Sequence, residues 1–105
     1  MSQRTVLVAD DEDHIRHLVR LYLYSEGFGV LEARTGKEAL SVWRQSSPDL
    51  IVLDIMLPGR DGWEVLRELR SNCRIREIPI VVCSVLDERD LAHAMGASAY
   101  LKKPY

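Results

Sequence analysis

The chain has 105 residues, of which 47% are hydrophobic, and a formal net charge of −2; this length suits one domain with a substantial core. Its 14 basic and 16 acidic residues are interspersed, which argues against direct binding of nucleic acid or of an anionic membrane surface. We recognise no secretory leader, no apolar run long enough to span a bilayer and only two cysteines, so we expect a cytoplasmic protein with reduced thiols.

Short apolar runs alternate with segments of helical periodicity along the whole chain. The apolar runs predict strands at residues 5–9, 29–33, 50–54, 78–83 and 99–101. The periodic segments between them predict four helices. A strand, helix, strand order of this kind predicts an α/β fold with a parallel sheet and right-handed crossovers.

Turn and capping residues mark the ends of the expected helices. Thr35 with Glu38 forms a capping-box pattern at the second helix, and Asp61 with Glu64 repeats it at the third. Four further positions are expected to start or stop helices: Glu12 or Asp13 as the first N-cap, Asp87 as the fourth N-cap, and Gly27 and Gly96 as stops.

Polar residues gather where the expected strands end. Asp54 closes an apolar strand that reads as buried on both faces, where an unpartnered carboxylate would be costly to ionise. Ligands of parallel sheets bind at the carboxyl ends of the strands. The residues expected at that edge are Asp10, Asp11, Asp54, Ser84 and Lys103.

Taken singly, each of these residues has an ordinary structural explanation. Asp10 or Asp11 is as consistent with helix capping as with a site, Ser84 with a turn, and Lys103 with a solvated charge. Together they indicate a site, because crowded carboxylates repel unless a cation neutralises them. A set of oxygen ligands without His or Cys favours Mg²⁺ over Zn²⁺. Lys103 and Ser84 would add a charge and a hydroxyl for phosphoryl oxygens.

These motifs carry a resemblance to a known family. Asp10-Asp11, the stretch from Asp54 to Gly59 with Asp61-Gly62, Ser84, and the stretch from Tyr100 to Pro104 resemble the receiver domain of two-component response regulators. The resemblance spans the chain from Val6 to its end. It implies a flavodoxin-like, doubly wound parallel sheet of five strands in the order 2-1-3-4-5.

The resemblance also implies a role for each motif residue. Asp54 would accept a phosphoryl group from a sensor histidine kinase or a phosphotransfer protein, as a signalling domain and not as an enzyme. Asp10, Asp11 and the backbone carbonyl of Met56 would hold Mg²⁺ together with Asp54. The remaining roles would be phosphoryl contacts by Ser84 and Lys103, an inward swing of Tyr100, and a cis peptide between Lys103 and Pro104.

The sequence departs from the usual pattern of that family in its fourth unit. Ser84 stands where Thr is commoner, Val85 where a small residue is usual, and the segment from Ser84 to Lys103 is short, which implies a short fourth helix. A downstream output domain or protein is a further partner that the resemblance allows.

Two other functions fit parts of the pattern. A haloacid-dehalogenase-like phosphatase also uses an aspartate after a buried strand, but it needs a second aspartate two residues later, where Met56 stands. A flavodoxin-like flavin binder would need a first loop that receives a phosphate, and the acidic run from Asp10 to Asp13 would repel one.

The helix count predicts an incompletely covered sheet. Right-handed crossovers place the first helix on one face and the next three on the other. We therefore expect residues 1–105 to be a receiver domain that lacks a fifth, final helix after Pro104. The apolar face left open is expected to be covered by further chain or by a second copy.

Overall fold

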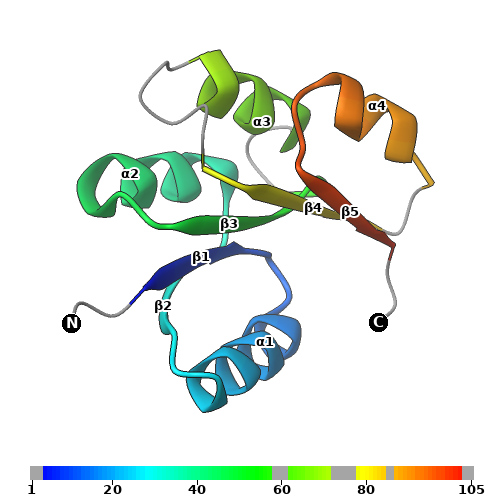
Figure 1. Cartoon of the computed structure of the whole chain (residues 1–105). Helices are drawn as coiled ribbons and strands as arrows, with labels where there is room; N and C mark the ends of the chain where they lie inside the picture. Colours follow the sequence, from blue (N-terminus) through cyan, green and yellow to red (C-terminus); the bar gives the residue numbers. More distant parts are fainter. Residues whose placement is uncertain (1–3, 58–61, 72–77, 85–86, 103–105) are drawn as a thin grey trace.

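A five-stranded parallel sheet forms the centre of the molecule (Figure 1). The computed structural model describes residues 4–57, 62–71, 78–84 and 87–102. The sheet order is β2-β1-β3-β4-β5, and every neighbouring pair is parallel. The elements are β1 (Thr5–Ala9), α1 (Asp13–Ser25), β2 (Gly29–Ala33), α2 (Gly36–Ser46), β3 (Leu50–Asp54), α3 (Gly62–Ser71), β4 (Ile80–Ser84), α4 (Arg89–Ala94) and β5 (Ala99–Lys102).

The predicted fold class and strand order are thereby confirmed. The fourth strand was predicted to start at Ile78, which is wrong, since β4 begins at Ile80 after Pro79. Proline has no backbone N–H to donate to a ladder, so the ordered pairing begins beyond it. α4 has only six residues, as the short segment predicted.

The first and fourth helices end shortly before Gly27 and Gly96, as predicted, but only some of the predicted N-caps are correct. Thr35 caps α2, because its hydroxyl accepts a hydrogen bond from the Glu38 N–H at 3.1 Å. At α1 the N-cap is Glu12, whose side chain makes no capping hydrogen bond. The predicted cap of α4 by Asp87 is wrong, since Glu88 is the N-cap there and also caps without its side chain. The predicted box of Asp61 with Glu64 lies partly outside the described residues.

The three layers are unequal, because α2, α3 and α4 cover one face of the sheet and α1 lies on the other (Figure 1). Strand residues that face the three helices are fully buried, such as Leu53 and Val82. On the α1 face, Val52 and Val81 remain half-buried. There α1 and Val52 line an apolar groove with a volume of about 440 Å³. No described helix combines the length and the hydropathy that crossing a bilayer would require.

Candidate functional site

The carboxyl ends of β1 and β3 bring three carboxylates together. Ala9 pairs with Leu53 in the parallel register, so Asp10 and Asp54 emerge side by side at this edge. Both are buried, with 3% and 4% of their surface exposed, whereas Asp11 is exposed. One carboxylate oxygen from each of Asp10, Asp11 and Asp54 lies within 4.8 Å of the other two. The predicted convergence of these three residues is therefore confirmed.

Backbone amides fix the orientation of the two buried carboxylates. The Glu12 N–H donates to Asp10 Oδ1 at 2.9 Å, and the Met56 N–H donates to Asp54 Oδ1 at 2.9 Å. In each case the carboxylate accepts a hydrogen bond from the amide two residues later, which is how Asp stabilises a turn. An aspartate thus shapes the turn at the carboxyl end of each of these two strands.

The connection after Asp54 depends on a glycine. The Gly62 N–H donates to the Ile55 carbonyl at 3.0 Å, and a Cβ at Gly62 would lie 2.4 Å from both the Cα and the carbonyl oxygen of Ile55. Only glycine permits this approach of two backbones. The glycine therefore holds the start of α3 against the loop that follows Asp54.

Strand β4, the neighbour of β3, brings Ser84 to the same edge of the sheet. Ser84 is the last residue of β4, is 1% exposed, and pairs in register with Lys102 of β5. Lys103 and Pro104 come next in the sequence but lie outside the described residues, as does the predicted cis peptide between them. Their roles stay predictions.

Tyr100 lies in the interior beside α4. The residue is 7% exposed, and its hydroxyl accepts a hydrogen bond from the Glu88 N–H at 3.1 Å. The Arg89 guanidinium lies 5.9 Å from the ring centroid, within the range of a cation–π contact. Tyr100 is thus already inward in this conformation, so the predicted inward swing stays a prediction.

The donor set of the carboxylate cluster suits a hard divalent cation. The grouped atoms are all carboxylate oxygens, and no His or Cys of the described residues belongs to the group. Oxygen-only sets with few protein ligands are typical of Mg²⁺, which keeps several waters. Asp10, Asp11 and Asp54 therefore fit the predicted ion. The carbonyl ligand expected from Met56 stays a prediction.

A buried arginine behind the cluster was not anticipated from the sequence. Arg16 on α1 is only 9% exposed, and its guanidinium donates three hydrogen bonds: to the Asp10 backbone carbonyl at 2.8 Å, to Glu32 Oε1 at 3.0 Å and to Asp13 Oδ1 at 2.6 Å. A glutamate inside the otherwise apolar strand β2 was the available signal, because a charge at such a position requires a partner.

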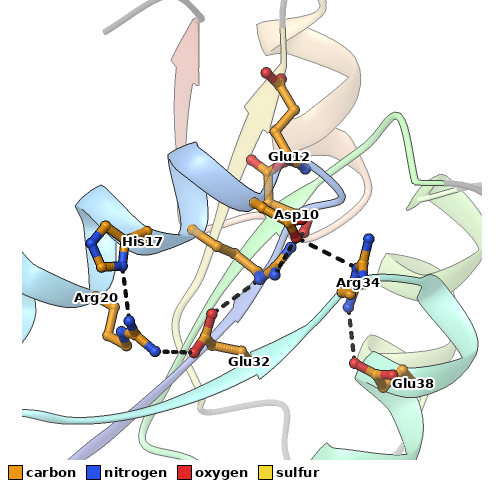
Figure 2. A network of polar contacts seen from close by, with 9 residues as sticks. Asp10, Glu12, His17, Arg20, Glu32, Arg34 and Glu38 are labelled. Atoms are coloured by element: carbon orange, nitrogen blue, oxygen red, sulfur yellow. Dashed lines mark hydrogen bonds and ion pairs between the residues drawn. The ribbon is translucent and has the colours of Figure 1, made fainter.

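Further charges extend this network, and Figure 2 shows Arg20 and His17 beside Glu32. Arg20 binds the second oxygen of Glu32 at 3.0 Å and contacts His17 Nδ1 at 2.8 Å. The hydrogen bond from Arg16, followed by the charge of Arg34, lowers the pKa of Asp13 below its usual value. The network joins α1, β2 and the turn after β1.

Comparison with known proteins yields one family. The family model described as the response regulator receiver domain matches residues 6–105. A curated relative, the probable transcriptional regulator ycf27 of Porphyridium aerugineum, is 36% identical over 105 residues, which are 100% of this chain and 44% of that protein. The chain therefore spans less than half the length of that relative.

Two solved structures illustrate the similarity of fold. The chemotaxis response regulator CheY4 of Vibrio cholerae has a TM-score of 0.93 and 28% identity, over 99% of this chain and 89% of that one. The BeF3-activated N-terminal receiver domain of Klebsiella pneumoniae RstA has a TM-score of 0.88 and 33% identity, over 97% of this chain and 87% of that one.

Proposed function

The chain belongs to the response regulator receiver domain family of two-component signalling, and from this membership we propose that Asp54 is its phosphoacceptor. The observation that carries the proposal is the convergence of Asp10, Asp11 and Asp54 within 4.8 Å at the carboxyl edge of the sheet. Of the three, only Asp54 ends the central strand β3. The donor would be the phosphohistidine of a sensor histidine kinase or of a phosphotransfer protein, in the cytoplasm.

The proposed reaction is a displacement at phosphorus. An oxygen of the Asp54 carboxylate attacks, the bond between phosphorus and the donor imidazole breaks, and its electron pair returns to the imidazole nitrogen, which takes up a proton. An acyl phosphate remains on Asp54. The Met56 amide holds the carboxylate in one orientation before the attack, so little reorganisation is needed.

Asp10, Asp11 and Asp54 would hold Mg²⁺, and the Met56 carbonyl would add a ligand. The bound ion would neutralise the crowded carboxylates and stabilise charge on the phosphoryl oxygens. Lys103 is proposed to pair with those oxygens, because it directly follows Lys102, the register partner of Ser84.

The signal is proposed to pass through Ser84 and Tyr100 to α4. Ser84 would donate its hydroxyl to the phosphoryl group, which is the differential contact that a population shift requires. Tyr100 would report the change, since its hydroxyl and ring contact Glu88 and Arg89 at the start of α4. A Ser84→Ala chain should accept phosphate but show smaller phosphate-dependent NMR shifts at Tyr100 and Arg89. Shifts equal to those of the wild type would contradict this coupling.

The relatives extend the proposal to partners. The relative from Porphyridium aerugineum is described as a transcriptional regulator, and its length is more than twice the part matched here. An output domain or protein controlled by this receiver is therefore proposed. Neither phosphoryl transfer nor this control requires the domain itself to be an enzyme.

Intact mass spectrometry tests the phosphoacceptor. The wild-type chain is incubated with Mg²⁺ and phosphoramidate, and one added phosphoryl group is expected. Asp54→Asn should show none, because an amide cannot attack phosphorus. Asp90→Asn, at an exposed position of α4, is the matched control and should be labelled like the wild type. A phosphoryl adduct retained on Asp54→Asn would refute the assignment.

A further inference from the structure

We propose that Arg16 is a positioning residue for the metal site, acting through the peptide between Asp10 and Asp11. This inference rests on the proposed Mg²⁺ site. The Asp10 carbonyl that Arg16 binds at 2.8 Å belongs to that peptide. Fixing the carbonyl fixes the plane from which both carboxylates project, and so the directions in which they reach toward Asp54.

The backbone of Asp10 is anchored on both sides. Its N–H donates to the Ala33 carbonyl at 3.0 Å, which ties it to the end of β2. Its carbonyl is tied to α1 by Arg16. The Asp10 carboxylate is held by the Glu12 amide. Asp11 can therefore move only if the peptide between Asp10 and Asp11 rotates. That rotation turns the Asp10 carbonyl and breaks its hydrogen bond to Arg16.

Arg16 is itself held rigidly enough to act as an anchor. It is buried, and Glu32 and Asp13 each accept a hydrogen bond from one of its other N–H groups. Glu32 comes from β2 and Asp13 from the first turn of α1. A planar guanidinium with donors in a fixed fork can satisfy three acceptors at once, which an ammonium on a flexible stem cannot reproduce with the same geometry.

The effect on metal binding should be large. Three carboxylates gathered without a cation repel, so the arrangement within 4.8 Å requires support from the surrounding structure. Residues that orient metal ligands without touching the metal typically contribute roughly 10- to 100-fold in metal affinity. We expect a loss in that range for Arg16→Met, and a smaller loss for Arg16→Lys.

The chain offers a matched control in Arg20. Arg20 also lies on α1 and also binds Glu32, at 3.0 Å to Oε2. Among the described residues it contacts Glu32 and His17 and makes no hydrogen bond to Asp10. Arg20→Met therefore removes one positive charge and one Glu32 contact while leaving the Asp10 carbonyl bonded. It should bind Mg²⁺ within about twofold of the wild type, apart from a small charge effect.

Calorimetric titration with Mg²⁺ alone, without a phosphodonor, is the experiment. Wild type, Arg16→Met, Arg16→Lys and Arg20→Met are compared at a temperature where circular dichroism in EDTA shows each to be folded, with Asp11→Ala as the reference for a lost ligand. The labelling rate with phosphoramidate is then measured against Mg²⁺ concentration. For a positioning role, the Mg²⁺ needed for half-maximal rate should rise in the Arg16 variants while the maximal rate recovers.

Each outcome decides the proposal. A weakened Mg²⁺ affinity in the Arg16 variants, with Arg20→Met near the wild type, supports it. A folded Arg16→Lys or Arg16→Met that binds Mg²⁺ as the wild type does overturns it, and so does an equal loss in Arg20→Met, which would indicate general electrostatics. Should Arg16→Met not fold, Arg16→Lys decides alone. A wild-type chain that binds no Mg²⁺ overturns the metal site and this inference together, whereas labelling of Asp54→Asn overturns only the phosphoacceptor.

Discussion

The two faces of the sheet differ in how completely helices cover their apolar side chains. On the face covered by α2, α3 and α4, side chains such as Leu53, Leu66 and Val82 are fully buried. On the other face, α1 leaves a groove, and Leu18 and Tyr22 beside it are 59% and 66% exposed. Neighbouring apolar residues of one strand, such as Val52 and Leu53, can thus differ in burial, because the helices decide how far each face of the sheet is covered.

The largest effect should come from truncating a residue of the covered face. Leu66→Ala removes a side chain with no exposed surface and should cost about 2–5 kcal/mol of unfolding free energy through lost burial and a cavity. Leu18→Ala, on the open face, should change it by less than about 0.5 kcal/mol. Urea unfolding measures both. Equal losses would show that the open face is buried in solution.

A glycine pair sharpens the comparison. Gly62→Ala places a Cβ against the backbone of Ile55 on the covered side, and overpacking of this kind should cost about 1–3 kcal/mol. Gly27→Ala, after α1, has open space but a φ of +89°, and should cost about 1 kcal/mol.

Thermal unfolding of the Gly62→Ala and Gly27→Ala chains tests this order. Labelling with phosphoramidate gives a second readout, because Gly62 holds the loop after Asp54. We expect slower labelling for Gly62→Ala alone. If Gly62→Ala were labelled and unfolded like the wild type, the close approach to Ile55 would not be important for the site.

The open face should cause self-association. Apolar surface that no described residue covers favours a partner, and a second copy of this chain offers the same surface. We expect the apparent mass of residues 1–105 in light scattering to rise with concentration. Leu18→Gln with Tyr22→Gln should reduce this rise. Leu91→Gln, at a 46% exposed position on α4, is the control and should not.

The result also bears on the predicted fifth helix. A chain continued beyond Tyr105 by about 15 residues, roughly one helix, should self-associate less if that segment covers the groove. If residues 1–105 stay monomeric at every concentration and bind no hydrophobic dye, the prediction that the open face causes self-association is wrong.

The smallest effect concerns pH. The pKa of Asp13 is lowered, first by the hydrogen bond from Arg16 and then by the charge of Arg34. A lowered pKa means that the carboxylate stabilises the fold above its unfolded value of 3.8, and that this contribution is lost as pH falls through the folded value. The melting temperature of Asp13→Asn should therefore lie slightly below that of the wild type at pH 7, and the difference should shrink as the pH falls below 3.8. A difference that does not change with pH would show that Asp13 contributes by something other than its charge.

The sequence alone predicted the order of elements, the parallel sheet and the three converging carboxylates. Strand and helix periodicities are local, and parallel strands necessarily end at one edge, so Asp10, Asp11 and Asp54 could be placed together without coordinates. The capping box at Thr35 was predictable for the same reason, since its partners are three residues apart.

Only the tertiary structure decided which residues distant in the sequence support the site. Arg16 meets Glu32 across 16 positions of sequence, and Tyr100 meets Glu88 across 12. Neither pair follows from a local period, because each depends on how a helix packs on the sheet. The same packing decides that α1 is the one described helix on its face of the sheet and that it leaves the groove open. Residue patterns thus determine which groups reach the edge of the sheet, and the packing of helices determines which distant side chains support them.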